Sequence, residues 1–304
     1  MLIGVTLIAY LLLYLLNAQS PNYIARVILT SRALPPAIKQ FNQANFLNRS
    51  FFVQYGHFMW NLVRLRLGTS YFHSQSVKSL LANELPRDIL LGGLSLIFSL
   101  LIAIPLGIAQ AVKRNKTVDY VGTAVSFSLY SMPPYAIAII LIQLLSISFH
   151  IFPAEAPQGQ GWLSMLEHPS GLVLPVVSLT LVSYAYFSRY MRSSALDTLA
   201  QDYIRTARAK GLPERLVLWR HLLKNSLVTV VTLVGLSIPT VITGTLIIEQ
   251  VFNFPGAGLE FYLAVTQNDF QVMLAITVLV GIITVLGNLM ADIGYAILDP
   301  RVRY

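Results

Sequence analysis

The sequence predicts an all-α polytopic membrane protein with six transmembrane helices. Of its 304 residues, 55% are hydrophobic and only 11% are charged, whereas about 25% of the residues of an ordinary soluble domain are charged. The mean hydropathy is +0.65. Six apolar runs interrupt the polar segments, and most of them reach the roughly 20 residues that a helix needs to cross a bilayer core about 30 Å thick.

The first apolar run, Leu2 to Leu16, is short and starts at the beginning of the chain. No basic residue precedes it and no convincing small-residue cleavage pattern follows it, so we do not interpret it as a cleaved signal peptide. We expect residues 1–17 to form the first transmembrane helix, with a few residues trimmed or with an alternative start.

A long segment, residues 18–88, separates this helix from the next run. Apolar residues recur in it at helical spacing, which predicts short amphipathic helices that lie against the outer face of the membrane. The repeats are Tyr55, Phe58, Met59, Leu62 and Val63, followed by Val77, Leu80 and Leu81. We favour a small packed extracytoplasmic cap over a dedicated ligand-binding domain.

The other five runs predict a core of five transmembrane helices in residues 89–304. They are Ile89 to Val112, Tyr120 to Phe149, Leu172 to Ser188, Ser226 to Ile248 and Phe270 to Ala291. The second of these is interrupted at Met132-Pro133-Pro134, and the third has Pro175 near its start.

Lysine and arginine gather in alternate connections between the runs. Residues 113–116 hold three, Arg189 to Lys224 hold eight and the chain end holds two, whereas Pro153 to Gly171 and Glu249 to Asp269 hold none. Because cytoplasmic loops carry the excess of Lys and Arg, we expect both termini in the cytoplasm. Eight more basic residues lie outside in this topology, between Asn17 and Asp88, in a segment too long for the rule to apply.

Ionisable residues are predicted only in loops or at the ends of the spans, where all thirteen Asp and Glu residues fall. Ion-coupled carriers place such groups inside spanning helices, so a proton or sodium relay is disfavoured. The chain also lacks the G-x-x-x-x-G-K-[ST] phosphate loop. Its five histidines are scattered, and it has no cysteine. We therefore expect no enzyme activity, no metal and no bound cofactor, and the energy for uphill movement must come from another chain.

The stretch Tyr203 to Asn225 is the largest predicted cytoplasmic surface, and it is basic. The formal net charge of the chain is +8, but its distribution along the loops indicates membrane topology rather than nucleic-acid binding. Leu196, Leu199, Tyr203 and Ala207 are expected on one helical face. Positive charge follows toward the helix C-terminus, where the helix dipole favours it. Gly211 suits a left-handed turn and Pro213 the first turn of a second helix.

Short side chains surround this turn, at Thr206, Ala207, Ala209 and Gly211. They permit the close approach of a partner backbone or groove. We favour such a docking role over a loop that only contacts lipid headgroups.

The run Arg205 to Gly211 resembles the EAA loop of ABC-transporter permease subunits, in the form found in the dipeptide, oligopeptide and nickel importer group. Arg205 and Thr206 stand where the family pattern opens with Glu-Ala. His221 and Asn225 resemble the end of the motif, although the usual Leu-Pro is absent.

Other places agree with the same group, so that the likeness covers nearly the whole chain. They are Glu249-x-Val251-Phe252-x-x-Pro255-Gly256-x-Gly258, Asn268-Asp269-Phe270, the end from Asp292 to Tyr304, Gln54-Tyr55, Leu67-Gly68-x-Ser70 and Leu85-Pro86. Arg66 departs from the pattern, because an acidic residue is usual at that place.

The resemblance implies the ABC type I importer permease fold and a place in a bacterial inner (plasma) membrane. The expected partners are a homologous second permease, two ABC ATPase subunits that bind the ATP, and an extracytoplasmic solute-binding protein. Within residues 189–225, the helix before the conserved glycine would insert into a groove of the ATPase. The implied coupling residues are Arg205, Thr206, Ala207, Arg208, Gly211 and Leu212.

The translocation path is expected between the two permeases. Candidate residues of the path or of an outer gate are Pro133, Pro134, Tyr135, Thr240, Thr243, Phe254, Pro255 and Gly256. The broken helix at Pro133 suits a watery cavity. Ser237 and Thr245 add hydroxyls to the fifth span, which also holds Thr240 and Thr243.

Several interpretations remain open at this point. Di- and oligopeptides are the favoured solute, and nickel or another small solute suits the same type of permease. The rival is an ATP-independent channel or secondary carrier whose basic loop binds anionic lipid. An intramembrane enzyme is a weaker third interpretation.

Overall fold

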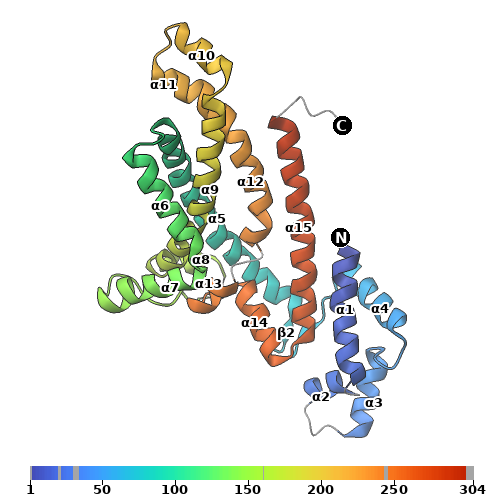
Figure 1. Cartoon of the computed structure of the whole chain (residues 1–304). Helices are drawn as coiled ribbons and strands as arrows, with labels where there is room; N and C mark the ends of the chain where they lie inside the picture. The colour runs from blue at the N-terminus through green and yellow to red at the C-terminus, as the bar shows by residue number, and fades with distance from the viewer. Residues whose placement is uncertain (1, 20–21, 30–33, 160, 243–245, 299–304) are drawn as a thin grey trace.

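The computed structural model describes residues 2–19, 22–29, 34–159, 161–242 and 246–298 (Figure 1). Within these ranges the chain is built from helices, with one short hairpin between two of them. The fold is therefore all-α, as the sequence predicts.

The N-terminal part consists of four helices and the hairpin. These are α1 (Leu2–Gln19), α2 (Tyr23–Leu29), α3 (Pro35–Ala44), α4 (Phe51–Val63), β1 (Thr69–Ser70) and β2 (Gln75–Ser76). The two strands are antiparallel, with Thr69 opposite Ser76. The first predicted apolar repeat lies in α4.

The core contains the long helices and several short ones, including the π-helical segments η1 and η2. Its elements are α5 (Val77–Val112), α6 (Thr117–Ser131), α7 (Pro134–Leu141), η1 (Ile142–Ser148), α8 (Leu163–Glu167), α9 (Ser170–Leu199), α10 (Asp202–Ala209), α11 (Glu214–Leu216), η2 (Val217–Leu223), α12 (Lys224–Ile242), α13 (Leu246–Val251), α14 (Ala257–Gln267) and α15 (Phe270–Leu298).

The helices pack around a central pair formed by α5 and α9 (Figure 1). Helix α6 packs against one side of α9 and α12 against another, while α15 packs against α12 and α1 against α15. The middle of the bundle is held by Ala103, Phe187, Met191 and Val230, which are all buried. The helices α10 and α11 project beyond the bundle at one end of the molecule (Figure 1).

Among the described residues, four helical segments are long and apolar enough to cross a membrane, and the number rises to six if each of two bent pairs counts as one span. The four are Val77–Val112, Ser170–Leu199, Glu214–Ile238 and Phe270–Met290. The pair Leu2–Ala18 and Tyr23–Leu29 is bent by 86°, and the pair Thr117–Ser131 and Pro134–Ser148 by 103°. The predicted six spans thus correspond to four straight segments and two bent ones.

Helix α5 begins twelve residues before the predicted start at Ile89. The second predicted amphipathic repeat, which starts at Val77, is therefore the first part of this long helix and not a separate one. The helix continues because its apolar residues there, Leu80 and Leu81, pack against Val272 of α15 and Ala264 of α14. As a consequence, Glu84, Arg87 and Asp88 lie in the first third of this 36-residue helix. About 20 residues suffice to cross the hydrocarbon core, so the three residues lie toward one end of the segment.

Helix α9 continues eleven residues past the predicted end at Ser188, so residues 189–199 are helical rather than loop. The predicted helical face from Leu196 to Ala207 is also interrupted, because Gln201 is extended (φ −73°, ψ 147°) and a new helix, α10, starts after it. This change of direction lets Ala207 pack against η2. A straight continuation of α9 would place Ala207 away from η2.

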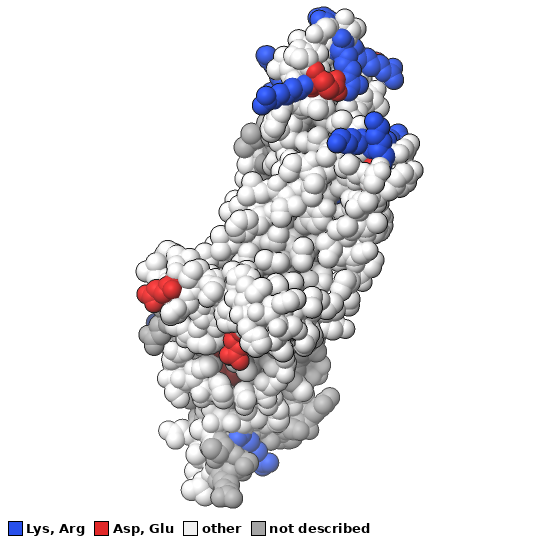
Figure 2. Space-filling model, turned by 90° about the vertical axis from the view of Figure 1, so that its left-hand side faces the viewer, with Lys and Arg blue, Asp and Glu red and all other residues white. Residues whose placement is uncertain are grey.

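Charge is distributed unevenly along the molecule. Figure 2 shows Lys and Arg gathered at the end formed by α10 and α11 and, slightly below, a second basic group, above a broad band without charged residues. We call the end formed by residues 113–116 and 202–224 the basic end, and the opposite end, which holds α13 and α14, the distal end. A charge-free band between polar ends is what a membrane-spanning protein requires.

Candidate functional site

The basic end has the helix, glycine turn and helix that the sequence predicts. Helix α10 ends at Ala209, and Gly211 adopts a left-handed conformation with φ +75°. The amide of Gly211 donates to the carbonyl oxygen of Arg208 at 2.9 Å, and that of Leu212 to Ala207 at 3.3 Å. These bonds close the end of α10, because the last carbonyls of a helix have no partner within it.

A bidentate ion pair spans this turn. Nη2 and Nε of Arg208 donate to the carboxylate of Glu214 at 2.6 and 3.1 Å. The hydrogen-bonded carboxylate raises the pKa of the Arg208 guanidinium above its usual value. This ion pair was not predicted from the sequence, although opposite charges six residues apart across a glycine turn are visible in it. The pair fixes the angle between α10 and α11.

The small residues of α10 do not share one exposed surface. Ala207 is only 5% exposed and packs with Ile204 and Val217, with Leu212 beside them. Thr206 and Ala209 are exposed, as is Arg205, whose side chain is 74% exposed. The docking surface inferred from the sequence therefore excludes Ala207, whose small size serves the close packing of α10 on its own chain.

The predicted break in the second core run is present. Helix α6 ends at Ser131, Met132 and Pro133 are extended, and α7 starts at Pro134. Neither proline has an N–H group, so the helical ladder cannot continue through them. Tyr135 is about half exposed.

A cavity of about 610 Å³ lies beside this break. Pro134 is one of its lining residues, and α5, α6, α9, α12 and α13 contribute others. Its hydroxyl-bearing lining residues are Ser95, Tyr130, Ser183, Tyr186 and Ser237. Of the other predicted path residues, Thr240 belongs to α12 and Thr243 lies outside the described residues, together with Thr245.

The other predicted gate residues lie at the distal end and do not line this cavity. Phe254 is fully buried in a core cluster with Leu174 and Phe252. Pro255 and Gly256 follow it in the connection to α14. The structure thus divides the predicted path residues into two groups, one beside the broken helix and one at the distal end.

Gly256 and Gly258 allow two carboxylates to approach the first turn of α14. A Cβ atom on Gly256 would lie against Asp88 Oδ1 and 2.6 Å from Glu249 Oε2, and one on Gly258 would lie 2.8 Å from Glu249 Oε1. The amide of Ala257 donates to Asp88 Oδ2 at 3.0 Å, and that of Leu259 to Glu249 Oε2 at 2.8 Å. Carboxylates are favoured at a helix N-terminus because free amides and the helix dipole meet there.

Arg87 ties three segments together at the same place. Its guanidinium donates to the carbonyl oxygens of Pro255 at 3.1 Å and Gly159 at 2.8 Å. Glu84, one turn earlier in α5, lies 3.4 Å from it. The arginine is nearly buried, so these contacts also supply the partners that a buried charge needs.

A second polar cluster joins the hairpin to the segment between α14 and α15. Asp269 Oδ2 accepts hydrogen bonds from the Ser70 hydroxyl at 2.6 Å and the Phe72 amide at 3.2 Å. Nε2 of His73 lies 2.9 Å from Oε1 of Glu260. Burial raises the pKa of the Glu260 carboxyl, and His73 opposes part of that shift.

We call these two clusters together the distal lock. Its members are Ser70, His73, Arg87, Asp88, Glu249, Glu260 and Asp269. From the sequence, Ser70, Glu249 and Asp269 were named only as parts of family matches, and no contact between them and the other members was predicted. Carboxylates next to a Pro-Gly-x-Gly turn were the available signal, since they suit the amides of a following helix.

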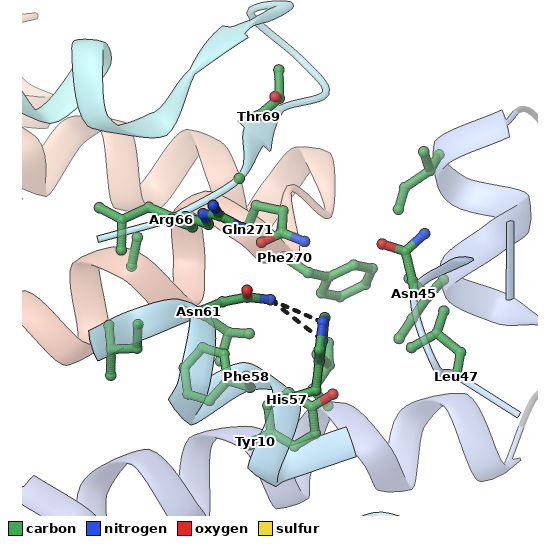
Figure 3. Close-up of a pocket in the computed structure, with 18 of the residues that line it drawn as sticks. Tyr10, Asn45, Leu47, His57, Phe58, Asn61, Arg66, Thr69, Phe270 and Gln271 are labelled. Atoms are coloured by element: carbon green, nitrogen blue, oxygen red, sulfur yellow. Dashed lines mark hydrogen bonds between the residues drawn. The ribbon is translucent and has the colours of Figure 1, made fainter. Parts of the chain in front are cut away.

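The N-terminal part encloses a pocket of about 460 Å³ (Figure 3). Residues of α1, α4 and α15 line it, including Tyr10, Phe58 and Phe270. The Asn61 amide nitrogen lies 3.3 Å from the ring nitrogens of His57, as the dashed lines in Figure 3 show. The cap predicted from the sequence is thus hollow where it meets the core.

Comparison with known proteins gives the family. The model of the family described as "Binding-protein-dependent transport system inner membrane component" matches residues 103–304. The chain belongs to this family. It is therefore a multi-pass membrane permease subunit, not itself catalytic, of a transporter that contains other subunits.

Relatives of the permease match it along nearly its whole length. It is 35% identical over 305 residues to the oligopeptide transport system permease protein AppB of Bacillus subtilis (strain 168), covering 100% of this chain and 95% of that protein. It is 34% identical to OppB of Haemophilus influenzae, with 90% of this chain and 88% of that protein covered. The glutathione transport system permease protein GsiC of Salmonella choleraesuis is 32% identical over 305 residues, which cover 100% and 96% of the two chains.

Solved structures show the same fold at lower sequence identity. A chain of the inward-facing MetNI methionine ABC transporter superposes with a TM-score of 0.59 at 17% identity, over 73% of the permease and 97% of that chain. A chain of an amino acid ABC transporter gives a TM-score of 0.56 at 14% identity, over 74% and 95%. The permease thus has the fold of an ABC importer permease.

Proposed function

We propose that the permease carries di- and oligopeptides into a bacterial cell and forms half of the path through the membrane. A homologous permease supplies the other half, two ATPase subunits bind and hydrolyse ATP, and an extracytoplasmic binding protein delivers the peptide. The names of the relatives support the solute, since two of them belong to oligopeptide systems and a third to a glutathione system. The basic end faces the cytoplasm, because basic loops are retained on that side.

The observation that carries the coupling role is the construction of the basic end. Its apolar residues, Ile204, Ala207 and Val217, pack inward, and the Arg208–Glu214 pair braces the turn. Arg205, Thr206 and Ala209 face outward at the tip. A rigid element that projects from the bundle is suited to transmit a rigid-body movement between subunits. We assign to it the contact with the ATPase, with Gly211 and Leu212 shaping the turn.

Selectivity between peptides, nickel and other small solutes is a separate question. In the described part of the chain, His, Asp and Glu form no group of three that suits a metal ion. Peptides are therefore the solute that we propose. An ATP-independent carrier is disfavoured by the family, whose members serve binding-protein-dependent systems.

The test is purification of the tagged permease from its native membrane, followed by reconstitution of the complete complex in proteoliposomes. We expect a second permease and ATPase subunits to co-purify, and peptide uptake to require both ATP and the binding protein. Uptake driven by the isolated permease and an ion gradient would refute the proposal.

A charge reversal tests the coupling role. Arg205→Glu should uncouple ATP hydrolysis from uptake without loss of folded permease, because the side chain is exposed. Arg114→Glu is the matched control, since it reverses an exposed charge elsewhere at the basic end. Unchanged coupling in Arg205→Glu, or equal losses in both variants, would contradict this assignment of the ATPase contact.

A further inference from the structure

We infer that Arg189 binds a carboxylate of the transported solute within the membrane. The inference rests on the proposed function, because it places the path of the peptide along α9. It adds a solute-binding residue at a position that sequence reasoning assigned to a cytoplasmic loop.

Arg189 is held by two aromatic rings of the neighbouring helix. Its guanidinium carbon lies 4.6 Å from the ring centroid of Phe127 and 4.6 Å from that of Tyr130, both in α6. No ion pair joins Arg189 to a carboxylate in the described ranges, whereas Arg192, one turn further along α9, makes a bidentate pair with Asp119 at 2.6 and 2.9 Å. Ring faces hold the guanidinium plane but leave the N–H groups at its edge available to an anion.

The depth of this guanidinium distinguishes it from an interfacial arginine. Phe127 and Tyr130 follow Asp119 by eight and eleven residues in α6. At 1.5 Å per residue they lie about 12 and 16 Å further from the basic end. Helical side chains tilt toward the helix N-terminus, so the two rings lie nearer to the basic end than their Cα atoms do. In a hydrocarbon core about 30 Å thick, Arg189 therefore reaches past the interface into the core.

The side chain also contacts the part of α6 that lies away from the basic end. Arg192 reaches Asp119, the third residue of α6, whereas Arg189 reaches Phe127 and Tyr130 further along it. Long basic side chains near a helix end normally extend to the closer interface. Arg189 extends away from the basic end, into the region where a charge is costly and therefore marks a functional site.

The 610 Å³ cavity shares one residue with the aromatic contact of the arginine. Tyr130, which contacts the guanidinium, is one of its lining residues, and so is Tyr186, about one turn before Arg189 in α9. Its walls combine apolar surface with the hydroxyls of Ser183 and the two tyrosines. The size lies within the usual range for a ligand site. An extended peptide has apolar side chains, hydrogen-bonding groups and a terminal carboxylate, and this arrangement complements all three.

The experiment compares a peptide that has a free C-terminal carboxylate with the same peptide amidated at that end. Uptake of each is measured with the complete complex in proteoliposomes, for the wild type, Arg189→Gln, Arg189→Lys and the control Arg114→Gln. We expect the wild type to prefer the free carboxylate. Arg189→Gln should lower that preference about tenfold or more, since a charge-assisted bidentate hydrogen bond is lost. Arg189→Lys should retain part of it, and Arg114→Gln all of it.

Each other outcome decides against the inference. Equal uptake of the two peptides by the wild type, or an unchanged preference in Arg189→Gln, would overturn it. Equal losses for both peptides in Arg189→Gln would show that Arg189 pairs with a carboxylate of the second permease instead. Failure of the proposed function is a separate result, in which an intact wild-type complex transports neither peptide.

Discussion

The two ends of the permease handle charge in opposite ways. At the distal lock, Asp88, Glu249 and Glu260 are buried and their carboxylates contact groups of the same chain. At the basic end, Arg205 and most other cations are exposed, and one ion pair across the turn is itself about half exposed.

The difference indicates at which end the charged groups are paired within the chain and at which end they are available to another subunit. Buried charges need their partners within the fold, because an unpaired one is costly. Exposed charges cost little and remain available to another subunit. The distal lock should therefore control the stability of the permease, and the basic end should control its coupling.

The largest expected effect is that of Gly256→Ala. The added Cβ would collide with the carboxylates of Asp88 and Glu249 at the first turn of α14. We expect a loss of at least about 3 kcal/mol, since overpacking and the loss of two helix-capping bonds add. The amount of folded permease in the membrane and its melting temperature in detergent measure this.

Gly93→Ala is the control for that variant. Gly93 lies in α5, the helix that carries Asp88, and a Cβ there would meet no atom within 4 Å. This change should be neutral or stabilise by about 0.5–1 kcal/mol. Equal melting temperatures for both variants would show that the carboxylates do not crowd Gly256.

A smaller effect is expected for Ala207→Leu at the basic end. Ala207 is buried against Ile204 and Val217, so a larger side chain should cost about 1–3 kcal/mol. Ala209→Leu, on the exposed side of α10, should leave the melting temperature unchanged and lower ATP-coupled uptake. If Ala209→Leu destabilised the permease and Ala207→Leu did not, our orientation of α10 would be wrong.

Gly211→Ala tests the turn alone. The space around Gly211 is open, so the cost arises from the left-handed backbone and should be about 1–2 kcal/mol. Hydrogen–deuterium exchange of residues 202–216 should become faster. Lys210→Ala, at a neighbouring residue with φ −76°, should exchange as the wild type does, and an identical rate in all three proteins would contradict the role of Gly211.

The smallest effect concerns pH at the distal lock. Because burial raises the pKa of Glu260 in the fold, its contribution to stability is full below the ordinary carboxyl pKa of about 4.3 and declines as the pH rises through the raised value. The melting temperatures of the wild type and Glu260→Gln should be measured from pH 4 to pH 8. We expect the melting temperature of the wild type to fall relative to that of the variant as the pH increases. A constant difference would refute this dependence.

Local features were predictable from the sequence. The apolar runs, the break at Pro133-Pro134 and the turn at Gly211 depend on residues that are neighbours in the chain, and proline and glycine restrict the backbone wherever they stand. The helix, turn and helix around Arg205 to Gly211 were predicted in the same way, and the role of this element in coupling stays a prediction.

Long-range pairing was not predictable from these patterns. Asp88 caps an amide 169 residues away, and Ser70 donates to a carboxylate 199 residues away. The early start of α5 at Val77 depends on α14 and α15, and the burial of Ala207 depends on η2. Hydropathy indicates whether a helix is surrounded by lipid or by water, but it does not indicate which helix packs beside it. These features could therefore be seen only in the three-dimensional structure.

The right-angled break after α6 has a consequence for the permeability barrier itself. The straight part of that span has 15 residues and is about 22 Å long, shorter than the roughly 30 Å of hydrocarbon in a bilayer. The straight part of this span is therefore too short to cross the hydrocarbon layer alone, and the cavity lies where the span breaks. Such a shape lowers the barrier that a hydrated solute meets, whereas work against a concentration gradient requires the energy of ATP.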